Sequence, residues 1–305
     1  MLPPMQTAEG FVFVRPGLHL YYRTVGTGPD VVLIPNANWL AELLAPLSPG
    51  RTLLFYDPRS RGRSSTVSES RQLSLEADVE DLEAVRRYFG ADRLSLLGSS
   101  YHAAITASWA IENPDRVERM VLACPITPRV PGEWAQELPS PEILIVPPGV
   151  PKLEALRKAE VDRTDPVAFC RAWFAQFLLP AQVSDPAAIE RFPLDDIASF
   201  PNEWPRHTMP LYFRDIVPKM GRWDFRPRLG GLAAPLLVIQ GTDDLVPVQA
   251  SEEWAAWAPD ARFLPIEAAG HHPYLEKPDE FFPAVEAFLD GRWPAGAEPV
   301  RRAAA

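Results

Sequence analysis

Short apolar runs alternate along the chain with longer segments in which apolar residues recur at helical spacing. The apolar runs are typical of buried strands and cover residues 31–34, 52–56, 94–97, 120–123, 235–240 and 262–266. The helical spacing covers residues 73–89, 103–110, 248–257 and 280–289. Two earlier runs, 11–14 and 19–24, flank Pro16-Gly17 and predict a hairpin. Because strands that alternate with helices pair through crossover connections, we predict an α/β fold, a mostly parallel sheet with helices on both faces.

The alternation stops after Cys124 and resumes near Pro235. The residues between are rich in proline and tryptophan, and a helix is predicted only over residues 167–179, with Asp165 as its N-cap and Pro166 at the first position. A sheet interrupted by an irregular insertion indicates a core that carries a cap. We therefore predict a core of residues 1–124 and 230–291, a cap of residues 125–229 and a C-terminal tail of residues 292–305.

The composition narrows the class of protein. A formal net charge of −10 disfavours a nucleic-acid partner, which requires a basic face. No apolar run approaches the length that spans a bilayer, and residues 1–10 lack the order of a signal peptide, so we expect no membrane partner. Cys124 and Cys170 make no disulfide framework in 305 residues, which favours a cytoplasmic protein. The oligomeric state stays open.

The stretch around residues 94–104 carries the first sign of chemistry. An apolar strand is followed by an alanine-rich helix, and Gly98 and Ser100 stand at the turn between them. This order is typical of a nucleophile elbow, G-x-S-x-G, which needs small residues because strand and helix pass close together. Ser100 is preferred to Ser99 because only Ser100 has a small residue two positions earlier. His102 departs from the pattern, which has glycine there, and we expect it to pack beside the elbow.

A serine nucleophile for acyl transfer needs a base and an acid that orients the base. Asp243 and Asp244 follow the predicted strand 235–240, and His271 follows the strand 262–266. The chain order serine, acid, histidine is the order of the hydrolase fold. Asp244 is preferred as the acid, with Asp243 as the alternative. His272, the neighbour of the candidate base, is expected to be a packing or surface residue.

With these motifs the chain resembles the α/β-hydrolase-fold enzymes, near the branch of prolyl iminopeptidases and carboxylesterases. The family's G-H-x-P-x-x-E-x-P pattern is matched by residues 270–278, and its G-x-x-D pattern by residues 241–244. Its D-x-R-G-x-G-x-S loop is matched by residues 57–64, with Ser60 in place of a glycine. The resemblance covers nearly all of the chain outside the cap, and it implies that His271 and Asp244 are catalytic. Arg59 is expected to hold its loop by charge-assisted bonds.

The resemblance leaves the oxyanion hole open. The family's H-G-x segment is replaced here by residues 35–37, so the Tyr101 N–H and one N–H from either Asn36 or Ala37 are the candidate donors. Trp39 follows this segment and is a candidate pocket wall, because ligand pockets are mostly apolar; ordinary packing is the alternative.

The cap contains the run Pro201-Asn202-Glu203-Trp204. Prolyl iminopeptidases use acidic cap residues to hold the free amine of the substrate, and the resemblance makes Glu203 and Trp204 candidate substrate-binding residues. The alternative is that Glu203 is a solvated or salt-bridged surface residue.

We predict a serine hydrolase that cleaves a small-molecule carboxylic ester through an acyl-enzyme. The chain has no CxxC or zinc-ligand spacing, and this chemistry requires neither a metal nor an organic cofactor. Two alternatives remain: an aminopeptidase like prolyl iminopeptidase that acts on a short peptide, and a hydrolase-fold binding protein in which His102 narrows the elbow.

Overall fold

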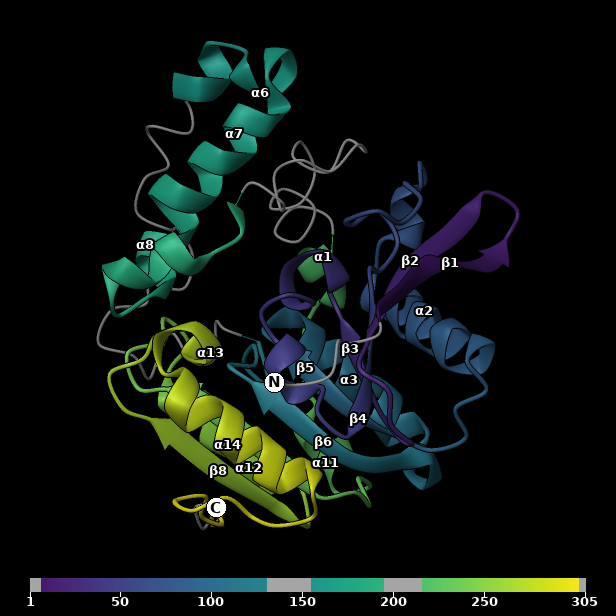
Figure 1. Ribbon diagram of the computed structural model, residues 1–305, viewed down its shortest axis with the longest axis vertical. Helices are drawn as coiled ribbons and strands as arrows, with labels where there is room; N and C mark the ends of the chain where they lie inside the picture. Colours follow the sequence, from purple (N-terminus) through teal and green to yellow (C-terminus); the bar gives the residue numbers. More distant parts are fainter. Residues whose placement is uncertain (1–6, 131–154, 195–215, 302–305) are drawn as a thin grey trace.

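The computed structural model describes residues 7–130, 155–194 and 216–301. Within these ranges eight strands form one sheet in the order β1-β2-β4-β3-β5-β6-β7-β8 (Figure 1). Strand β2 pairs antiparallel with β1 and β4, and all the other neighbours are parallel, which confirms the predicted α/β fold. The strands are β1 (Thr7–Arg15), β2 (Leu18–Val25), β3 (Asp30–Pro35), β4 (Arg51–Tyr56), β5 (Leu94–Ser99), β6 (Val117–Ala123), β7 (Leu236–Gly241) and β8 (Ala261–Ile266).

Helices cover both faces of the sheet, as predicted. Helices α1 (Ala37–Leu40) and α14 (Pro278–Leu289) pack on one face. Helices α2 (Leu75–Tyr88), α3 (Tyr101–Glu112) and α12 (Val248–Trp257) pack on the other. The shorter helical elements outside residues 155–194 are η1 (Ala45–Leu47), η2 (Ser70–Gln72), η3 (Pro114–Arg116), η8 (Val217–Met220), α11 (Arg226–Leu229) and α13 (Pro273–Glu276).

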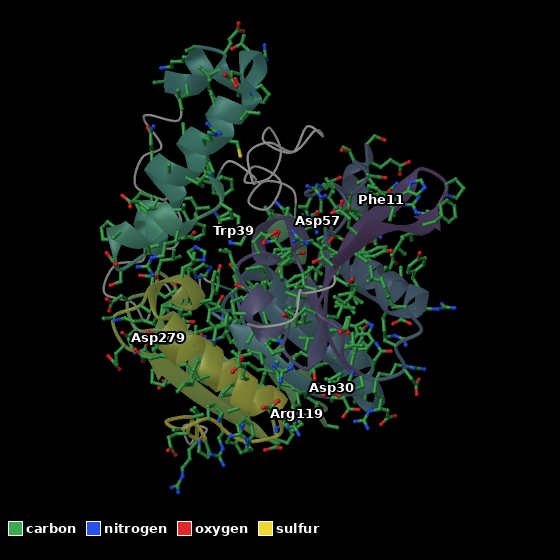
Figure 2. The ribbon with its side chains drawn as sticks, in the orientation of Figure 1. Phe11, Asp30, Trp39, Asp57, Arg119 and Asp279 are labelled. Carbon is green, nitrogen blue, oxygen red and sulfur yellow. The ribbon has the colours of Figure 1, made fainter. Side chains whose placement is uncertain are left out.

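The central strands are apolar on both faces because both faces are covered. In β3, Val32 and Ile34 join the core cluster under α14, and Leu33 joins the cluster under α2 and α3. The outermost hairpin differs, since Phe11 and Phe13 of β1 are 54% and 60% exposed. Figure 2 shows Phe11 on this outer hairpin. The apolar runs therefore mark the strands that are buried on both faces.

Helix ends follow local chemistry. Ser74 caps α2 by accepting a hydrogen bond from Ala77 N at 3.3 Å, and Arg86 and Arg87 lie in its last turn, where cations are favourable. The predicted helix 103–110 begins earlier, at Tyr101, because the turn that holds Ser100 leads directly into α3.

Residues 155–194, the longest described part of the predicted cap, are mainly helical and are called the cap segment below. They contain α6 (Val161–Thr164), α7 (Pro166–Trp173), a π-helical turn η5 (Phe174–Leu178), α8 (Leu179–Gln182) and η6 (Pro186–Arg191). Asp165 accepts from Ala168 N at 2.9 Å, which confirms it as the N-cap of the predicted helix. Trp39 packs against Phe174 and Phe192, with ring centroids 5.0 and 5.3 Å apart, so it lies where the cap segment meets the core (Figure 2).

The boundaries of the predicted core and cap stay a prediction. Residues 216–229 contribute Ile216, Phe225 and Leu229 to the core cluster under α3 and α12. Near the C-terminus, Glu298 pairs with Phe263 of β8 through two main-chain hydrogen bonds of 2.9 Å. In the part of the chain that the structure describes, no helix combines the length and the apolar character needed to cross a membrane.

Trp254 of α12 gives a test of this packing. Its side chain is fully buried, its Nε1 donates to Ile126 O at 2.7 Å, and its ring stacks on Phe225 at 5.1 Å. We expect Trp254→Ala to lower the free energy of unfolding by about 3–5 kcal/mol, because it leaves a cavity and an unpaired carbonyl. Urea denaturation measures the change. Trp257→Ala, a change at a partly exposed tryptophan of the same helix, is the control, and equal losses would contradict the assignment of Trp254 to the core.

Candidate active site

The turn between β5 and α3 holds Ser100 in an unusual backbone conformation, with φ 54° and ψ −128°. Positive φ is costly for a residue with a side chain, so the surrounding structure must maintain it. Ser100 N donates to Ala123 O at 3.1 Å, which continues the pairing of β5 with β6 into the turn. The side chain is thereby placed at the carboxyl end of the sheet, where ligands bind in open α/β sheets.

Gly98 is required by a close approach of two backbones. A Cβ at this position would lie 2.7 Å from Ala103 Cα, 2.8 Å from His102 O and 2.3 Å from Thr106 Oγ1. The second small position of the elbow pattern is not needed here, because His102 is accommodated with its side chain buried. The chain therefore keeps the essential glycine of the elbow and replaces the other.

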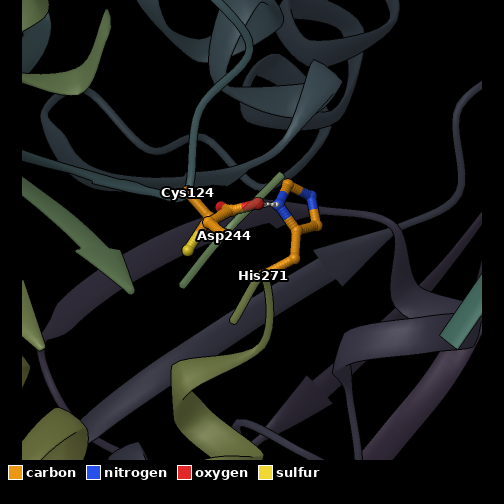
Figure 3. A group of neighbouring side chains, drawn as sticks. All are labelled: Cys124, Asp244 and His271. Atoms are coloured by element: carbon orange, nitrogen blue, oxygen red, sulfur yellow. Dashed lines mark hydrogen bonds and ion pairs between the residues drawn. The ribbon is translucent and has the colours of Figure 1, made fainter. Parts of the chain in front are cut away.

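His271 and Asp244 lie in direct contact (Figure 3). His271 Nδ1 is 2.9 and 2.8 Å from the two carboxylate oxygens of Asp244. Since an ionised carboxylate only accepts, Nδ1 carries the proton, and in the neutral imidazole Nε2 then keeps a lone pair. The Asp244 carboxylate also accepts from Gln240 Nε2 at 2.5 Å and from Val246 N at 3.1 Å. The alternative acid, Asp243, instead accepts from Ser184 Oγ at 2.5 Å.

One cavity joins most of the predicted site residues. Asn36, Trp39, Ser100, Tyr101 and His271 all line it. The Asn36 N–H donates to Tyr56 O at 2.7 Å. Ala37, which is buried beside this wall, begins the short helix α1 and is not one of the lining residues. The Asn36 N–H already has an acceptor, which leaves the Ala37 N–H as the candidate oxyanion donor from this segment.

Buried charges support the loop of residues 57–64 next to this cavity. The Asp57 carboxylate accepts from Asn38 N at 2.8 Å and from Arg63 N at 3.0 Å, so it ties the start of α1 to the loop. Burial raises the pKa of Asp57 to about 6. Arg59 is 2.5 Å from Asp81 through Nη2 and Oδ1, with both side chains buried, which confirms its expected role of holding the loop.

Arg61, which was not predicted from the sequence, also lines the cavity. Arg61 is 1% exposed, and its Nη2 is 2.5 Å from Asp78 Oδ1. The other oxygen of Asp78 accepts from Tyr101 Oη at 2.9 Å. Burial, and next the positive charge of Arg61, lower the pKa of His102 to about 3, so this imidazole is neutral. Arg61 occupies a variable position of its loop motif, so no sequence signal pointed to it.

His272 was expected to be a packing or a surface residue, and the structure shows that it is buried. It lines the cavity and contacts Tyr274 Oη through Nδ1 at 2.7 Å and Gln182 Oε1 through Nε2 at 3.0 Å. Burial and the neighbouring His271 lower the pKa of His272 well below the ordinary histidine value. The remaining predicted site residues, Glu203 and Trp204, lie outside the described residues.

Among the described residues, one group has the side chains to hold a metal ion: Cys124, Asp244 and His271, whose ligand atoms lie within 4.8 Å of one another (Figure 3). The Asp244 and His271 atoms are 2.8 Å apart, whereas two ligands of one tetrahedral ion with bonds of about 2.1 Å are roughly 3.4 Å apart. Burial, and next the charge of Asp244, also raise the pKa of the Cys124 thiol well above its usual value, which disfavours the thiolate that binds metals. The contact is therefore a hydrogen-bonded pair with a thiol beside it.

Comparison with known proteins shows the family to which the chain belongs. The family model of the alpha/beta hydrolase fold matches residues 34–278. The chain therefore belongs to the α/β hydrolase fold family and is a hydrolase of that fold.

Individual relatives are distant and differ in the reactions they are named for. A proline iminopeptidase of Heyndrickxia coagulans is 22% identical over 298 residues, covering 92% of this chain and 98% of that protein. The bifunctional epoxide hydrolase 2 of Sus scrofa is 23% identical over 303 residues; these cover 91% of this chain but only 54% of the relative, so the chain spans about half its length. A thermophilic esterase from Thermogutta terrifontis superposes with a TM-score of 0.64 at 22% identity, covering 93% of this chain and 98% of that one.

The close approach at Gly98 generates a prediction. We expect Gly98→Ala to lower the free energy of unfolding by about 1–3 kcal/mol, because the added methyl group overlaps backbone atoms of α3. Gly230→Ala is the matched control, since a Cβ there meets nothing within 4 Å and its φ of −60° suits alanine. Urea denaturation of both variants provides the comparison. A loss at Gly98 no larger than that at Gly230 would show that the elbow has room to adjust.

Proposed function

We propose that the protein is a serine hydrolase that cleaves a small-molecule carboxylic ester through an acyl-enzyme, with Ser100 as nucleophile, His271 as base and Asp244 as the acid that orients it. The observation that carries the proposal is the His271–Asp244 hydrogen bond beside a cavity that both His271 and Ser100 line. Membership of a hydrolase family supports it. In this proposal residues 125–229 form the cap.

The protonation state of His271 determines the steps. Because Nδ1–H is donated to Asp244, Nε2 is the atom that takes the proton as Ser100 Oγ attacks the ester carbonyl carbon. The tetrahedral intermediate carries its negative charge on the former carbonyl oxygen. Its collapse breaks the ester bond, and His271 returns the proton to the departing alcohol. Water then attacks the acyl-enzyme with His271 as base again, which releases the acid and frees Ser100.

The N–H groups of Tyr101 and Ala37 are the proposed oxyanion donors. Tyr101 N is the first amide of α3, directly after the nucleophile. In the other segment, the neighbours of Ala37 have their partners: Asn36 N donates to Tyr56 O, and Asn38 N donates to Asp57. Each such donor contributes about 3–4 kcal/mol of transition-state stabilisation.

The wall of the cavity supports an ester rather than an amine-bearing peptide as substrate. The described lining is largely apolar and aromatic, with residues such as Trp39, Phe174 and Leu178, which suits a neutral acyl group. Arg61 is the charged side chain of this described lining, and none of the described lining residues carries a carboxylate. The described lining therefore offers no carboxylate to hold a substrate ammonium group.

The aminopeptidase alternative keeps its support from the relatives that are named proline iminopeptidases. It needs an acidic group to hold the amine, and the candidate for that task is Glu203. The His271–Asp244 pair argues against the binding-protein alternative. A hydrogen-bonded imidazole and carboxylate in the cavity that Ser100 lines are needed for turnover and not for binding.

The substrate class is tested with a panel of p-nitrophenyl esters and amino-acid p-nitroanilides, including that of proline. We expect turnover of the esters and its loss in Ser100→Ala, because acyl transfer requires the hydroxyl. Ser99→Ala is the control; Ser99 is the last residue of β5 and should keep most of the activity. A fluorophosphonate probe should label the wild type and Ser99→Ala but not Ser100→Ala.

Other results of the panel have distinct meanings. Preferred turnover of proline p-nitroanilide would replace the esterase assignment by the aminopeptidase one. Turnover of neither substrate class, with no labelling, would leave the binding protein. Labelling lost only in Ser99→Ala would mean that the wrong serine has been assigned.

The orienting acid is tested by Asp244→Asn. An amide donates to His271 Nδ1 or accepts from it weakly, so it favours the wrong tautomer and leaves the imidazolium unstabilised. We expect kcat to fall on the order of 10³- to 10⁴-fold. Asp243→Asn is the matched control, because Asp243 contacts Ser184 instead, and its kcat should stay near that of the wild type. Comparable losses at the two positions would remove the distinction between them.

A further inference from the structure

The cap segment and the loop that carries His271 are in main-chain contact. His271 N donates to Gln182 O at 2.6 Å, and Gln182 is the last residue of α8 in the cap segment. At the preceding position there is no room for a side chain, since a Cβ on Gly270 would lie 2.3 Å from Gln182 O and 3.0 Å from Ser184 N. The candidate base is therefore attached through its own amide to the cap segment.

Glu276 joins the same two segments through its carboxylate. Its Oε2 accepts from Ser184 N at 2.6 Å and from Asp185 N at 3.0 Å, both in the cap segment. Its Oε1 accepts from Gly270 N at 2.9 Å, the amide directly before that of His271. The side chain is 9% exposed, and hydrogen bonds to a buried carboxylate are charge-assisted and short. One carboxylate thus binds the end of the cap segment on one side and the histidine loop on the other.

His272 forms a second, uncharged connection between these parts. Because the neutral imidazole has one donor and one acceptor nitrogen, and Gln182 Oε1 only accepts, Nε2–H donates to Gln182 and Nδ1 accepts from Tyr274 Oη. Tyr274 Oη in turn accepts from Trp39 Nε1 at 3.3 Å. These three hydrogen bonds all donate in the same direction, from Trp39 in the core through Tyr274 and His272 to Gln182 in the cap segment.

We propose that Glu276 is a positioning residue for the reaction: its carboxylate couples the docking of the cap segment, at residues 182–185, to the position of the His271 imidazole. The proposal rests on the proposed function in that His271 is taken as the base. It follows that this end of the cap segment stays docked during catalysis, and that loss of docking here disturbs proton transfer between Ser100 and His271 rather than substrate entry alone.

The variant that tests the coupling is Glu276→Gln, which keeps the size of the side chain and replaces one acceptor oxygen by an NH₂ group. In either orientation that NH₂ faces an N–H donor, of the cap segment or of Gly270. We expect kcat for a p-nitrophenyl ester to fall about 10-fold to 100-fold, because small misplacement of a reacting group is costly. KM should stay within about threefold of the wild type, since the cavity wall is unchanged.

The matched control is Glu280→Gln, which removes the same charge from an exposed glutamate four residues further on, in the first turn of α14. Its kcat and KM should equal those of the wild type. If Glu276→Gln does not fold, Glu276→Asp takes its place: it retains the charge but is one methylene shorter, so it cannot reach both segments, and the same criteria apply.

A second readout separates this proposal from the proposed function. The proton on His271 Nδ1, bonded to Asp244, gives a low-field proton NMR signal that is identified by its absence from His271→Ala. We expect Glu276→Gln to shift or broaden this signal, and Glu280→Gln to leave it unchanged. If the wild type hydrolyses no ester, the proposed function fails, and the signal alone decides the coupling. A folded Glu276→Gln with an unchanged signal, or with a raised KM at unchanged kcat, would overturn the proposal.

Discussion

The candidate site depends on the contact between the backbones of β5 and α3. Gly98 lies so close to Ala103 that no side chain fits between them, and the chain passes from β5 into α3 through the single residue Ser100. The positive φ of Ser100 persists because α3 is almost entirely buried and cannot move away from the sheet. The end of β6 has a similar feature, because Cys124, directly after this strand, also has a positive φ, of 45°. Strain at the carboxyl edge of the sheet is thus maintained by packing beneath it.

Buried charge sets the shape of the loops around this turn. Arg59 pairs with Asp81, Arg61 with Asp78, and the carboxylates of Asp57 and Glu276 accept main-chain N–H bonds. Burying two ions costs desolvation free energy, and their mutual attraction offsets this cost only when the geometry is good. Such pairs are therefore poor evidence for a stable fold. Their effect is better described as conformational, because each one holds a loop in a single position relative to a neighbouring segment. The oxyanion segment, the nucleophile turn and the histidine loop are all held in this way.

The α/β hydrolase fold accounts for the positions of the loops and not for the substrate. Its members use the same sheet edge for different reactions, and the distant relatives of this chain are named as a proline iminopeptidase, an epoxide hydrolase and an esterase. The cavity wall of this chain is formed in part by Arg61, the neutral His102 and Ser100. The substrate class that we propose follows from that wall and from the hydrogen-bonded His271–Asp244 pair, and not from the fold.

The sequence by itself determined the sheet, its helices and the order of the chemical residues along the chain. The buried strands are marked by apolar runs, and the N-caps and the glycine of the elbow depend on neighbours a few residues away, so periodicity and local motifs are sufficient for them. Ser100, Asp244 and His271 are predicted in the same way, since each lies in a loop or turn that follows a strand and a short motif selects it there.

Only the tertiary structure decided which of these residues meet. That Asp244 rather than Asp243 contacts His271, that the Asn36 N–H is already donated to Tyr56, and that Arg61 lines the cavity depend on the packing of segments far apart in sequence. The same is true of Glu276, a motif residue whose carboxylate meets Ser184, 92 positions earlier in the chain. Hydrogen bonds are short and directional, so which donor reaches which acceptor is settled by distances of a few tenths of an ångström, and those distances exist only once the whole chain has packed.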